Sequence, residues 1–248
     1  AMYDRNEILS FINKRKHVTI TELCVNFEIS DSTARRAVSQ LERLGKCGRF
    51  HGGAYAIGQA GKSQVMIRQS ETSSVKVQIA KAAASIVRDG ATCIILSGST
   101  VGYMHRFIKD KQITVITNSL LIFDELRSHA NVKLIVLGGL YNYEEEELGG
   151  VIANTTLDYL RADYLFMGAS SFDERSGFIN KNMSVEVYRA CLNACDTACM
   201  LVDSSKYGAG GASIAARPEQ VKYLFTDPDR DAKVVKKFQQ KGIKVIQT

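Results

Sequence analysis

The sequence has 248 residues, of which 45% are hydrophobic and 23% charged, and its formal net charge is +6. That length suits one small and one medium domain with buried cores, and no apolar run reaches the roughly 18 residues of a membrane-spanning helix. These properties exclude a protein built on membrane-spanning helices. Since no apolar signal segment is present either, they predict a cytoplasmic protein with no membrane partner.

The positive charge is concentrated near the N-terminus. Of the 32 Lys and Arg, 10 lie in residues 1–62, with only 6 of the 26 Asp and Glu. A basic segment is typical of a module that approaches nucleic-acid phosphates, although this excess is modest. The charge alone therefore decides nothing, and the residue pattern must be considered with it.

Two short helices are predicted before residue 30. Apolar residues recur at helical spacing in residues 4–13. In residues 18–29, Thr19 followed by Glu22 forms a capping box, and Leu23 lies on an apolar face. A turn of about three to four residues then leads to the next helix, which is the spacing of a helix-turn-helix.

Residues 30–45 carry the most informative pattern. Ser30 is a natural N-cap and Gly45 a natural stop for a helix. One face of this helix is apolar and is expected to be buried through Ala34, Val38, Leu41 and Leu44. Such a helix would pack its apolar stripe on the two helices before it.

The opposite face of the same helix presents hydroxyls and guanidinium groups. We expect it to contact DNA through Ser32, Thr33, Arg35, Arg36 and Ser39. Hydroxyls and guanidinium groups bind phosphates, and arginine can donate two hydrogen bonds to guanine in the major groove. The alternative is an ordinary solvated helix face. The preceding helix and turn favour a recognition helix.

A short β-like segment follows at residues 46–57, with glycines at its bend. It is interpreted as the wing of a winged helix, in which Arg49 and His51 contact the DNA backbone or minor groove; the alternative is an ordinary hairpin. We therefore predict a winged helix-turn-helix domain (α+β) over residues 1–60. Residues 61–74, rich in Gly, Ser and Gln, are the expected linker.

Residues 75–248 have the pattern of an α/β domain that binds an effector and forms oligomers. After a helical stripe over residues 75–86, apolar runs occur at 92–96, 113–117, 133–137, 163–167, 198–202, 222–226 and 243–247. Amphipathic segments separate most of these runs, which predicts a mostly parallel sheet with helices on both faces. Ligands of such sheets bind outside the carboxyl ends of the strands.

Hydroxyl, amide and glycine residues follow five of these predicted strands. Each loop alone is ordinary turn chemistry, but five at one sheet edge favour a ligand site. Residues 97–100 in particular combine hydroxyls with an expected helix N-terminus, which suits a phosphate. The residues expected at this site are Ser97, Gly98, Ser99, Thr100, Asn118, Gly139, Gly168, Ser170, Asp203 and Lys206. No dinucleotide or ATP fingerprint occurs, so a small phosphorylated metabolite fits better.

The six cysteines are Cys24, Cys47, Cys93, Cys191, Cys195 and Cys199, and most lie within apolar helix or strand patterns. Reduced cytosolic cysteines are used in this way as small core residues. The last three are spaced four apart, but no histidine is near them and Cys-x-x-Cys spacing is absent. We therefore expect packing, no disulfide, no metal and no cofactor.

With these motifs in place, nearly the whole chain resembles the DeoR family of bacterial regulators of sugar metabolism. The N-terminal resemblance rests on residues 33–36, Leu41, Gly45 and 51–54, and the C-terminal resemblance on 97–100, 117–119, 138–139, Gly168, Gly177, Glu186 and 203–206. It implies a sensor domain similar in fold to ribose-5-phosphate isomerase. It also implies a sugar-phosphate effector with Glu186 among its contacts, a repressor, and a dimer or tetramer on a double-stranded operator.

The chain departs from the family pattern at several positions. Ala34 and Ala37 stand where Ile and Asp are common beside the arginines, which puts helix docking and operator choice in doubt. Leu96 and Ser170 stand where acids are usual, and Ser171 where a glycine is usual. Without those two carboxylates the site is expected to be short of acids, and a different sugar, or weak or absent sensing, becomes an alternative.

Three functions are compatible with these patterns. The first is a DNA-binding repressor of sugar uptake or catabolism whose operator binding responds to a phosphorylated sugar. The second is a DNA-binding protein whose large domain only forms oligomers and has no effector. The third is a sugar-phosphate isomerase, which needs a carboxylate base. Since the site is expected to be short of acids, we predict that the protein is not an enzyme and has no catalytic residues.

Overall fold

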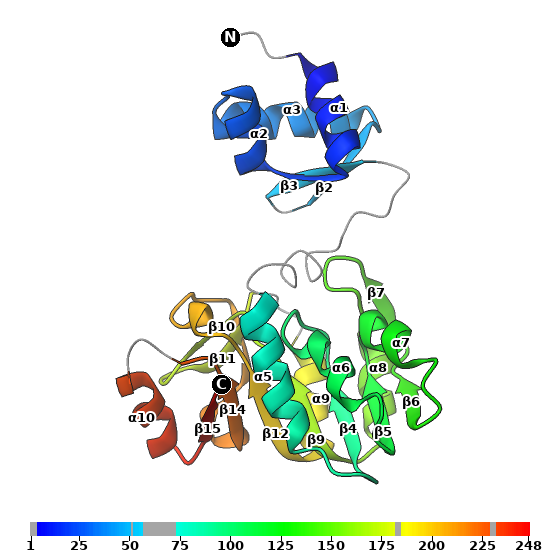
Figure 1. The fold of residues 1–248 in the computed structure, drawn as a ribbon, viewed down its shortest axis with the longest axis vertical. Coiled ribbons are helices and arrows are strands. Elements are labelled where there is room, and N and C mark those ends of the chain that lie inside the picture. Colours follow the sequence, from blue (N-terminus) through cyan, green and yellow to red (C-terminus); the bar gives the residue numbers. More distant parts are fainter. Residues whose placement is uncertain (1–3, 51, 57–72, 182–184, 229–231) are drawn as a thin grey trace. The chain divides into compact units, whose positions relative to one another are not determined.

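The computed structural model describes residues 4–50, 52–56, 73–181, 185–228 and 232–248. The chain divides into two compact units, Ala1–Ile67 and Arg68–Thr248 (Figure 1). The expected linker at 61–74 falls largely on residues 57–72, outside the described residues. Within the described part of the chain, no helix combines the length and apolarity needed to cross a bilayer.

The described residues of the N-terminal unit form three helices and a small antiparallel sheet. The helices are α1 (Arg5–Arg15), α2 (Ile20–Phe27) and α3 (Asp31–Arg43), and the strands are β1 (His17–Thr19), β2 (Cys47–Phe50) and β3 (Gly53–Ala56) in the order β1-β3-β2. Their core includes Ile8, Ile12, Leu23, Val38 and Leu41. Three helices with a β2–β3 wing form the predicted winged helix-turn-helix.

Local hydrogen bonds explain where α2 and α3 begin. Thr19 N donates to Glu22 Oε2 at 2.7 Å and Glu22 N donates to Thr19 Oγ1 at 3.1 Å, which is the predicted capping box. Glu28 ends α2 in a left-handed conformation, with φ of 50°. Ser30 then caps α3 by accepting from Thr33 N at 3.3 Å. The turn between the two helices is therefore fixed by its own residues.

The end of α3 differs from the predicted packing. Leu44, expected in the buried stripe, is 62% exposed, because α3 ends at Arg43 and Gly45 turns the chain with a φ of +65°. Gly45 does stop the helix as predicted. Ala37, which the predicted stripe omitted, is fully buried beside Ala34 and Val38.

The C-terminal unit is organised on one parallel sheet. Its seven strands are β4 (Thr92–Ile95), β5 (Ile113–Thr117), β6 (Val132–Val136), β9 (Ala162–Met167), β12 (Cys195–Leu201), β14 (Tyr223–Thr226) and β15 (Lys244–Gln247). They correspond to the seven predicted apolar runs, and their order is β15-β14-β12-β9-β4-β5-β6. All of their pairings are parallel. The α/β prediction is confirmed.

Helices cover both faces of this sheet. Along β4, Cys93 and Ile95 belong to one core, with α5 (Ser73–Ser85), η1 (Val101–Met104), α6 (His105–Ile108) and α7 (Leu120–Leu126). Ile94 belongs to the other core, with α8 (Val151–Leu157), α9 (Glu186–Asn193) and α10 (Ala232–Gln240). Strand side chains alternate between faces, so a strand that is apolar throughout is buried on both.

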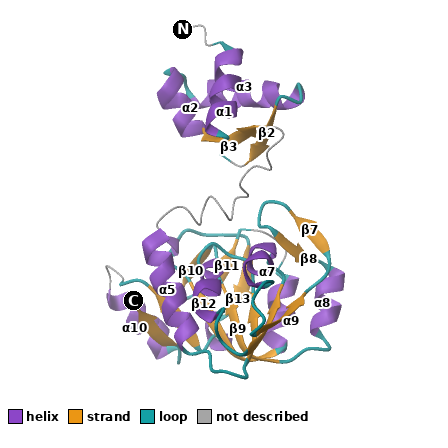
Figure 2. Cartoon of the chain, turned by 45° about the vertical axis from the view of Figure 1, so that its right-hand side comes forward, coloured by secondary structure: helices purple, strands orange, loops and turns teal. Residues whose placement is uncertain are grey.

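Short antiparallel strands, which the sequence patterns did not predict, lie beside the main sheet (Figure 2). β7 (Leu140–Asn142) and β8 (Glu147–Gly149) form one hairpin, while β10 (Ser171–Asp173), β11 (Gly177–Asn180) and β13 (Ser213–Ala216) form a three-stranded sheet. All five strands have only three or four residues, too few for their alternation to be recognised.

The strand order reverses at the middle of the sheet. From β4 the chain first adds β5 and β6 on one side and then returns to add β9, β12, β14 and β15 on the other. The loops after β4 and β9 therefore leave the sheet in different directions and open a crevice between them. In doubly wound sheets this switch point is where ligands bind.

Candidate functional site

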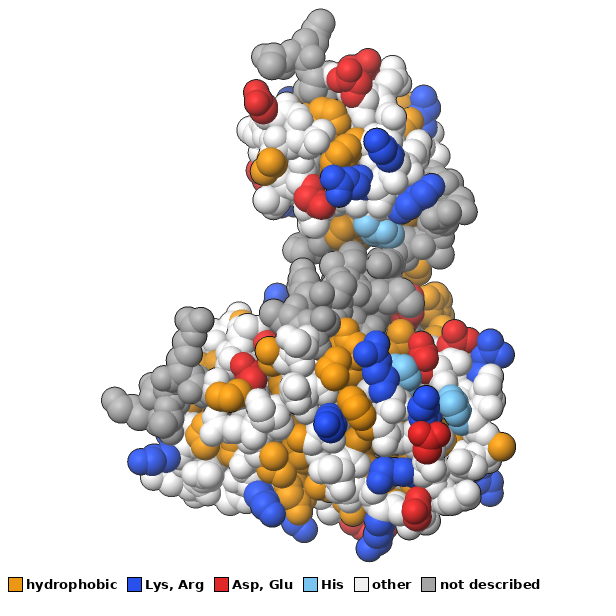
Figure 3. Space-filling view, viewed as in Figure 1, with side chains coloured by type: hydrophobic (Ala, Val, Ile, Leu, Met, Phe, Trp, Pro, Cys, Tyr) orange, Lys and Arg blue, Asp and Glu red, His pale blue; other side chains and the backbone are white. Residues whose placement is uncertain are grey.

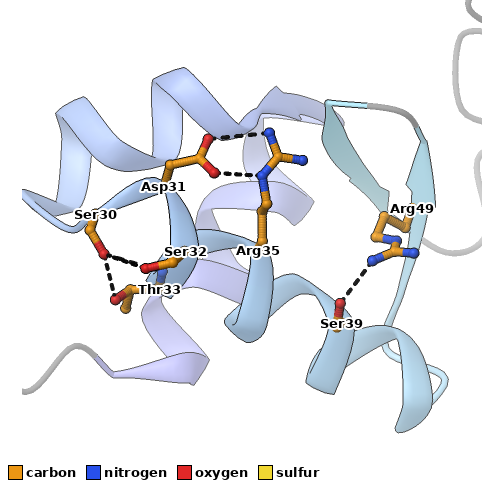
Figure 4. A network of polar contacts seen from close by, with 7 residues as sticks. All are labelled: Ser30, Asp31, Ser32, Thr33, Arg35, Ser39 and Arg49. Atoms are coloured by element: carbon orange, nitrogen blue, oxygen red, sulfur yellow. Dashed lines mark hydrogen bonds and ion pairs between the residues drawn. The ribbon is translucent and has the colours of Figure 1, made fainter.

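The outward face of α3 carries the residues predicted to contact DNA. Ser32, Arg35 and Arg36 are exposed, while Thr33 and Ser39 are half-buried. The hydroxyl of Ser30 shares hydrogen bonds with Ser32 Oγ at 3.0 Å and Thr33 Oγ1 at 2.8 Å. These hydroxyls form one polar group at the start of the helix, as Figure 4 shows.

The two arginines of α3 differ in their surroundings. Arg35 donates to both carboxylate oxygens of Asp31, at 2.5 and 3.2 Å, one helical turn earlier. That hydrogen bond, and then the charge of Asp31, raise the pKa of Arg35. No side-chain partner is recorded for Arg36 within the described residues, and it is exposed. Arg36 can meet DNA directly, whereas Arg35 must first leave Asp31.

The wing contributes a third cation to the same surface. Arg49 of β2 donates from Nη1 to Ser39 Oγ at 2.8 Å (Figure 4). Its Nε lies 3.4 Å from Glu42 Oε2. These contacts join the wing to α3 by side chains distant from the core. His51, the other predicted wing contact, lies outside the described residues.

The C-terminal unit offers no comparable basic surface on the side drawn in Figure 3. On that face, Lys and Arg side chains are interspersed with Asp and Glu. The surface formed by α3 and the wing combines Arg35, Arg36 and Arg49 with the hydroxyls at the start of α3, and it is the candidate nucleic-acid interface.

A polar pocket opens at the carboxyl ends of β4, β9 and β12, at the switch point. Its volume is about 120 Å³. It is lined by Ser97, Gly98, Ser99, Thr100, Asn142, Glu145, Glu147, Gly168, Ala169, Ser170, Asn180, Lys181, Tyr188, Leu201, Val202, Asp203 and Lys206. The lining includes eight of the eleven residues predicted to contact the effector.

The loop after β4 is held in place by its neighbours. Ser97 N donates to Asn118 Oδ1 at 3.0 Å, and Ser97 Oγ donates to the Glu145 carbonyl at 2.6 Å. Asn118 is 1% exposed and does not line the pocket. It therefore positions the loop from beneath. The predicted single helix after Thr100 is instead the 3₁₀ turn η1 followed by one turn of α6.

The loop after β12 places one carboxylate and one cation at the pocket. Asp203 is 5% exposed and accepts from the backbone N–H and the hydroxyl of Ser205. Asp227 holds Ser204 from the next strand, accepting from its N–H at 2.6 Å and its hydroxyl at 2.7 Å. These bonds fix the 3₁₀ turn η2 (Ser204–Lys206), which carries Lys206 to the pocket.

The pocket lining also contains residues that the sequence patterns missed, namely Asn142, Glu145, Glu147, Asn180, Lys181 and Tyr188. Burial, and then the charge of Glu147, raise the pKa of the Tyr188 phenol, opposed by a hydrogen bond with Asn180. The phenol therefore stays protonated and able to donate. The only sequence signal of these six residues is that they are polar side chains in short strands, turns and one helix.

Two of these residues correct an inference from the sequence. The pocket was expected to be short of acids, because Leu96 and Ser170 replace carboxylates. Leu96 is buried in the core, as an apolar residue there would be. Glu145 and Glu147 nevertheless line the pocket, because the β7–β8 hairpin folds over it. Carboxylates are present, but they come from a different segment.

Besides Asn118, two residues predicted to contact the effector, Glu186 and Gly139, are not among the lining residues. Glu186 is exposed in the first turn of α9 and is not among the lining residues. Gly139 lies between β6 and β7, where an added Cβ would stand 2.2 Å from the Gly149 carbonyl oxygen. Gly139 is thus needed for the close approach of the hairpin strands.

All six cysteines are free thiols. Burial raises the pKa of Cys47 to about 11 and that of Cys93 to about 12, and it also raises the pKa of Cys191 and Cys199. Protonated buried thiols are poor metal ligands and poor nucleophiles. Among the described residues, no cluster of three or more metal-binding side chains occurs.

Comparison with known proteins identifies the family. Residues 5–60 match the model of the DeoR-like helix-turn-helix domain, and residues 71–228 match that of the DeoR C terminal sensor domain. The chain belongs to the DeoR family. It is therefore a DNA-binding transcriptional regulator with a C-terminal sensor domain.

Several curated DeoR-family relatives match over most of their length. The HTH-type transcriptional regulator YulB of Bacillus subtilis is 30% identical, over 97% of this chain and 94% of that protein. The L-fucose operon activator of Haemophilus influenzae is 27% identical over 89% of each. UlaR of Escherichia coli is 24% identical over 96% of each. These proteins are named as regulators, in agreement with the prediction that the chain is not an enzyme.

Solved structures with related folds include two other groups of proteins. Ribose 5-phosphate isomerase A from Methanocaldococcus jannaschii matches with a TM-score of 0.40 and 18% identity, over 55% of each chain. The eIF2B beta of Chaetomium thermophilum matches with a TM-score of 0.49 and 16% identity, over 68% of this chain and 54% of that one. These matches concern the fold alone.

Proposed function

We propose that this regulator represses an operon for uptake or catabolism of a sugar, and that a phosphorylated sugar in the pocket alters its grip on the operator. The observation that carries the proposal is the joint presence of an exposed cationic recognition helix and a polar pocket at the switch point of the sheet. Repression is favoured because occupying a promoter requires DNA contact alone. A dimer or tetramer follows from the need to contact two half-sites.

Two groups of lining residues suit the two parts of such a ligand. Lys206 and the hydroxyls of Ser99 and Thr100 supply a cation and donors for a phosphate. Asn142, Glu147, Asn180 and Tyr188 supply the donors and acceptors that a polyol needs. An unphosphorylated sugar would lack the charge that Lys206 recognises.

The α3 surface and the pocket are coupled through the conformations that each ligand favours. An effector that binds better to one conformation shifts the population toward it, and DNA does the same with its own preference. The coupling is reciprocal and is typically about 1–3 kcal/mol, or a change in affinity of roughly 5- to 150-fold. The direction of the response is an outcome of the experiment below.

A gel-shift titration on the DNA upstream of the gene tests the proposal. Wild type should bind this DNA specifically. The protein concentration that binds half of the DNA should change when at least one member of a panel of pentose and hexose phosphates is added. Lys206→Ala should keep the shift but lose the response to the sugar phosphate, while Lys236→Ala, an exposed lysine of α10, should keep both. The absence of a specific shift at any salt concentration would contradict the proposal.

A thermal-shift screen separates this function from that of a domain that only forms oligomers. A ligand at 100 times its dissociation constant stabilises the folded state by about 2.7 kcal/mol. The stabilisation should appear with the same sugar phosphate that moves the gel-shift midpoint and should be lost in Lys206→Ala. If no sugar phosphate stabilises the wild type, the oligomerisation-only function replaces ours.

A further inference from the structure

The β7–β8 hairpin and the start of α8 leave large apolar side chains in water. Leu140 is 81% exposed, Val151 80%, Ile152 63% and Tyr141 47%. We call these four residues the hairpin patch. They are contiguous, because Leu140 pairs with Gly149 just before α8, and Ile152 lies against Gly138. Figures 1 and 2 both place the hairpin at one corner of the C-terminal unit.

The hairpin has little apolar cover from the residues that the structure describes. Consecutive strand residues point to opposite faces, yet Leu140 and Tyr141 are both exposed, so both faces of the ribbon are uncovered. A two-stranded hairpin is marginally stable in water unless a face packs on something else. The adjacent strand β6 is an edge of the seven-stranded sheet, so the main sheet also ends at this corner.

The backbone of the hairpin is nonetheless firmly placed. Leu148 N donates to the Asn118 carbonyl at 2.8 Å, and Leu120 N donates to the Glu146 carbonyl at 3.0 Å. Asn118 Nδ2 donates to Glu147 Oε2 at 3.2 Å. An ordered apolar surface, unlike a fluctuating loop, loses little conformational entropy when a partner covers it.

The size of the hairpin patch is that of an interface core. Its four residues expose on the order of 500 Å² of mostly apolar surface, near the upper end of what monomeric proteins show. A standard interface removes about 800 Å² from each partner, with an apolar centre and a polar rim. The four residues supply such a centre and carry no charge themselves, while Glu144, Glu145 and Glu146 in the turn of the same hairpin add carboxylates beside it.

We propose that the hairpin patch is the face through which two copies of this chain pair. An apolar patch can pack on the same patch of a second copy across a two-fold axis, as a symmetric dimer contact requires. The inference rests on the proposed function, which includes a dimer or tetramer, and it adds the surface through which that oligomer forms. The same hairpin carries Asn142, Glu145 and Glu147 into the pocket, so the pairing face and the ligand site share one element.

Sedimentation velocity of the full chain tests this pairing without DNA or effector. Wild type, with a chain mass of 27.3 kDa, should sediment as a dimer or larger assembly at micromolar concentration. Leu140→Glu/Ile152→Glu should halve that mass. Val25→Glu is the matched control, because Val25 is 76% exposed on α2 in the other unit, and it should keep the wild-type mass.

A second variant guards against misfolding. Val151→Glu places the charge at the first residue of α8, and it should also weaken the assembly while keeping the wild-type melting temperature. If Leu140→Glu/Ile152→Glu keeps the wild-type mass, the hairpin patch is not the pairing face, and the proposed function still stands. A monomeric wild type would also overturn this pairing. Loss of mass in both patch variants, with folding intact, would support it even if no sugar phosphate affected DNA binding.

Discussion

The described side chains of the candidate nucleic-acid interface come from residues 30–49, whereas the pocket is lined by residues between 97 and 206. On α3, neighbours on the surface are three or four positions apart in sequence. In the pocket, Ser97 is held by Asn118 and Glu145, from two other segments. A surface formed by one helix can change without altering the core, while a pocket assembled from loops changes with each loop.

The largest expected effect tests whether the two units are energetically separate. Phe238 is fully buried, with its ring 5.8 Å from those of Phe172 and Phe178. Phe238→Ala should destabilise the C-terminal unit by about 3–5 kcal/mol through lost burial and a cavity. Calorimetry should show that transition shifted and the N-terminal one unchanged. Phe123→Ala, at a 37% exposed position, is the control, and equal shifts of both transitions would contradict the separation.

A smaller effect is expected at the recognition helix. Arg36→Ala should weaken operator binding by about 1–3 kcal/mol, because it removes an exposed guanidinium group from the α3 surface. The melting temperature should not change. Fluorescence anisotropy across a salt series measures the loss, with Arg127→Ala in the other unit as a charge-matched control. Equal affinity of both variants would remove Arg36 from the interface.

Removing one buried amide beside the pocket should lower both folding stability and ligand affinity, whereas Arg36→Ala should lower DNA affinity alone. Asn118→Ala removes the acceptor of Ser97 N and the donor to Glu147, which should cost about 1–3 kcal/mol of folding stability. It should also weaken sugar-phosphate binding without touching the ligand, because it releases the loop after β4. Denaturant unfolding and thermal shift measure the two effects, with exposed Asn131→Ala as the control. Unchanged ligand affinity would exclude the positioning role.

These contrasts also explain what could be predicted from sequence. The helix-turn-helix was predictable because caps, turn and apolar stripe lie within a few residues of one another, as Thr19 and Glu22 illustrate. The seven parallel strands were predictable because strands buried on both faces are apolar throughout. Glu147 and Tyr188 were not predictable, since only the tertiary path of the hairpin and α9 brings them to the pocket. Arg35 was predicted as a DNA contact, but its ion pair with Asp31 depends on side-chain conformation.

A finer test uses that ion pair. Exposed ion pairs contribute little to stability, so Asp31→Ala should change the melting temperature little. It removes a negative charge that competes with phosphate for Arg35, and DNA affinity should rise by about two- to fivefold. Anisotropy titration at low salt measures the gain. The double variant Asp31→Ala/Arg35→Ala should lose it, and weaker binding by Asp31→Ala would reverse the assignment.

The smallest expected effect concerns acid stability of the C-terminal unit. Glu174 accepts from Lys237 Nζ and from Tyr207 Oη, and these bonds lower its pKa from an ordinary 4.5 to about 2. The ionised carboxylate therefore stabilises the folded state above about pH 4.5, and this contribution is lost as the pH falls toward 2. Glu174→Gln should flatten that part of the melting profile. Parallel profiles for the two proteins would contradict the assignment.

The reversal of strand order beside β4 has an evolutionary consequence. The segment that follows β4 and the segments that follow β9 and β12 meet at one crevice, yet they are far apart along the chain. Mutation can therefore alter the part of the pocket lining that the β7–β8 hairpin contributes, while the serine-rich loop after β4 stays unchanged. Descendants of one ancestral regulator can in this way acquire new chemical signals without redesigning the scaffold that receives them.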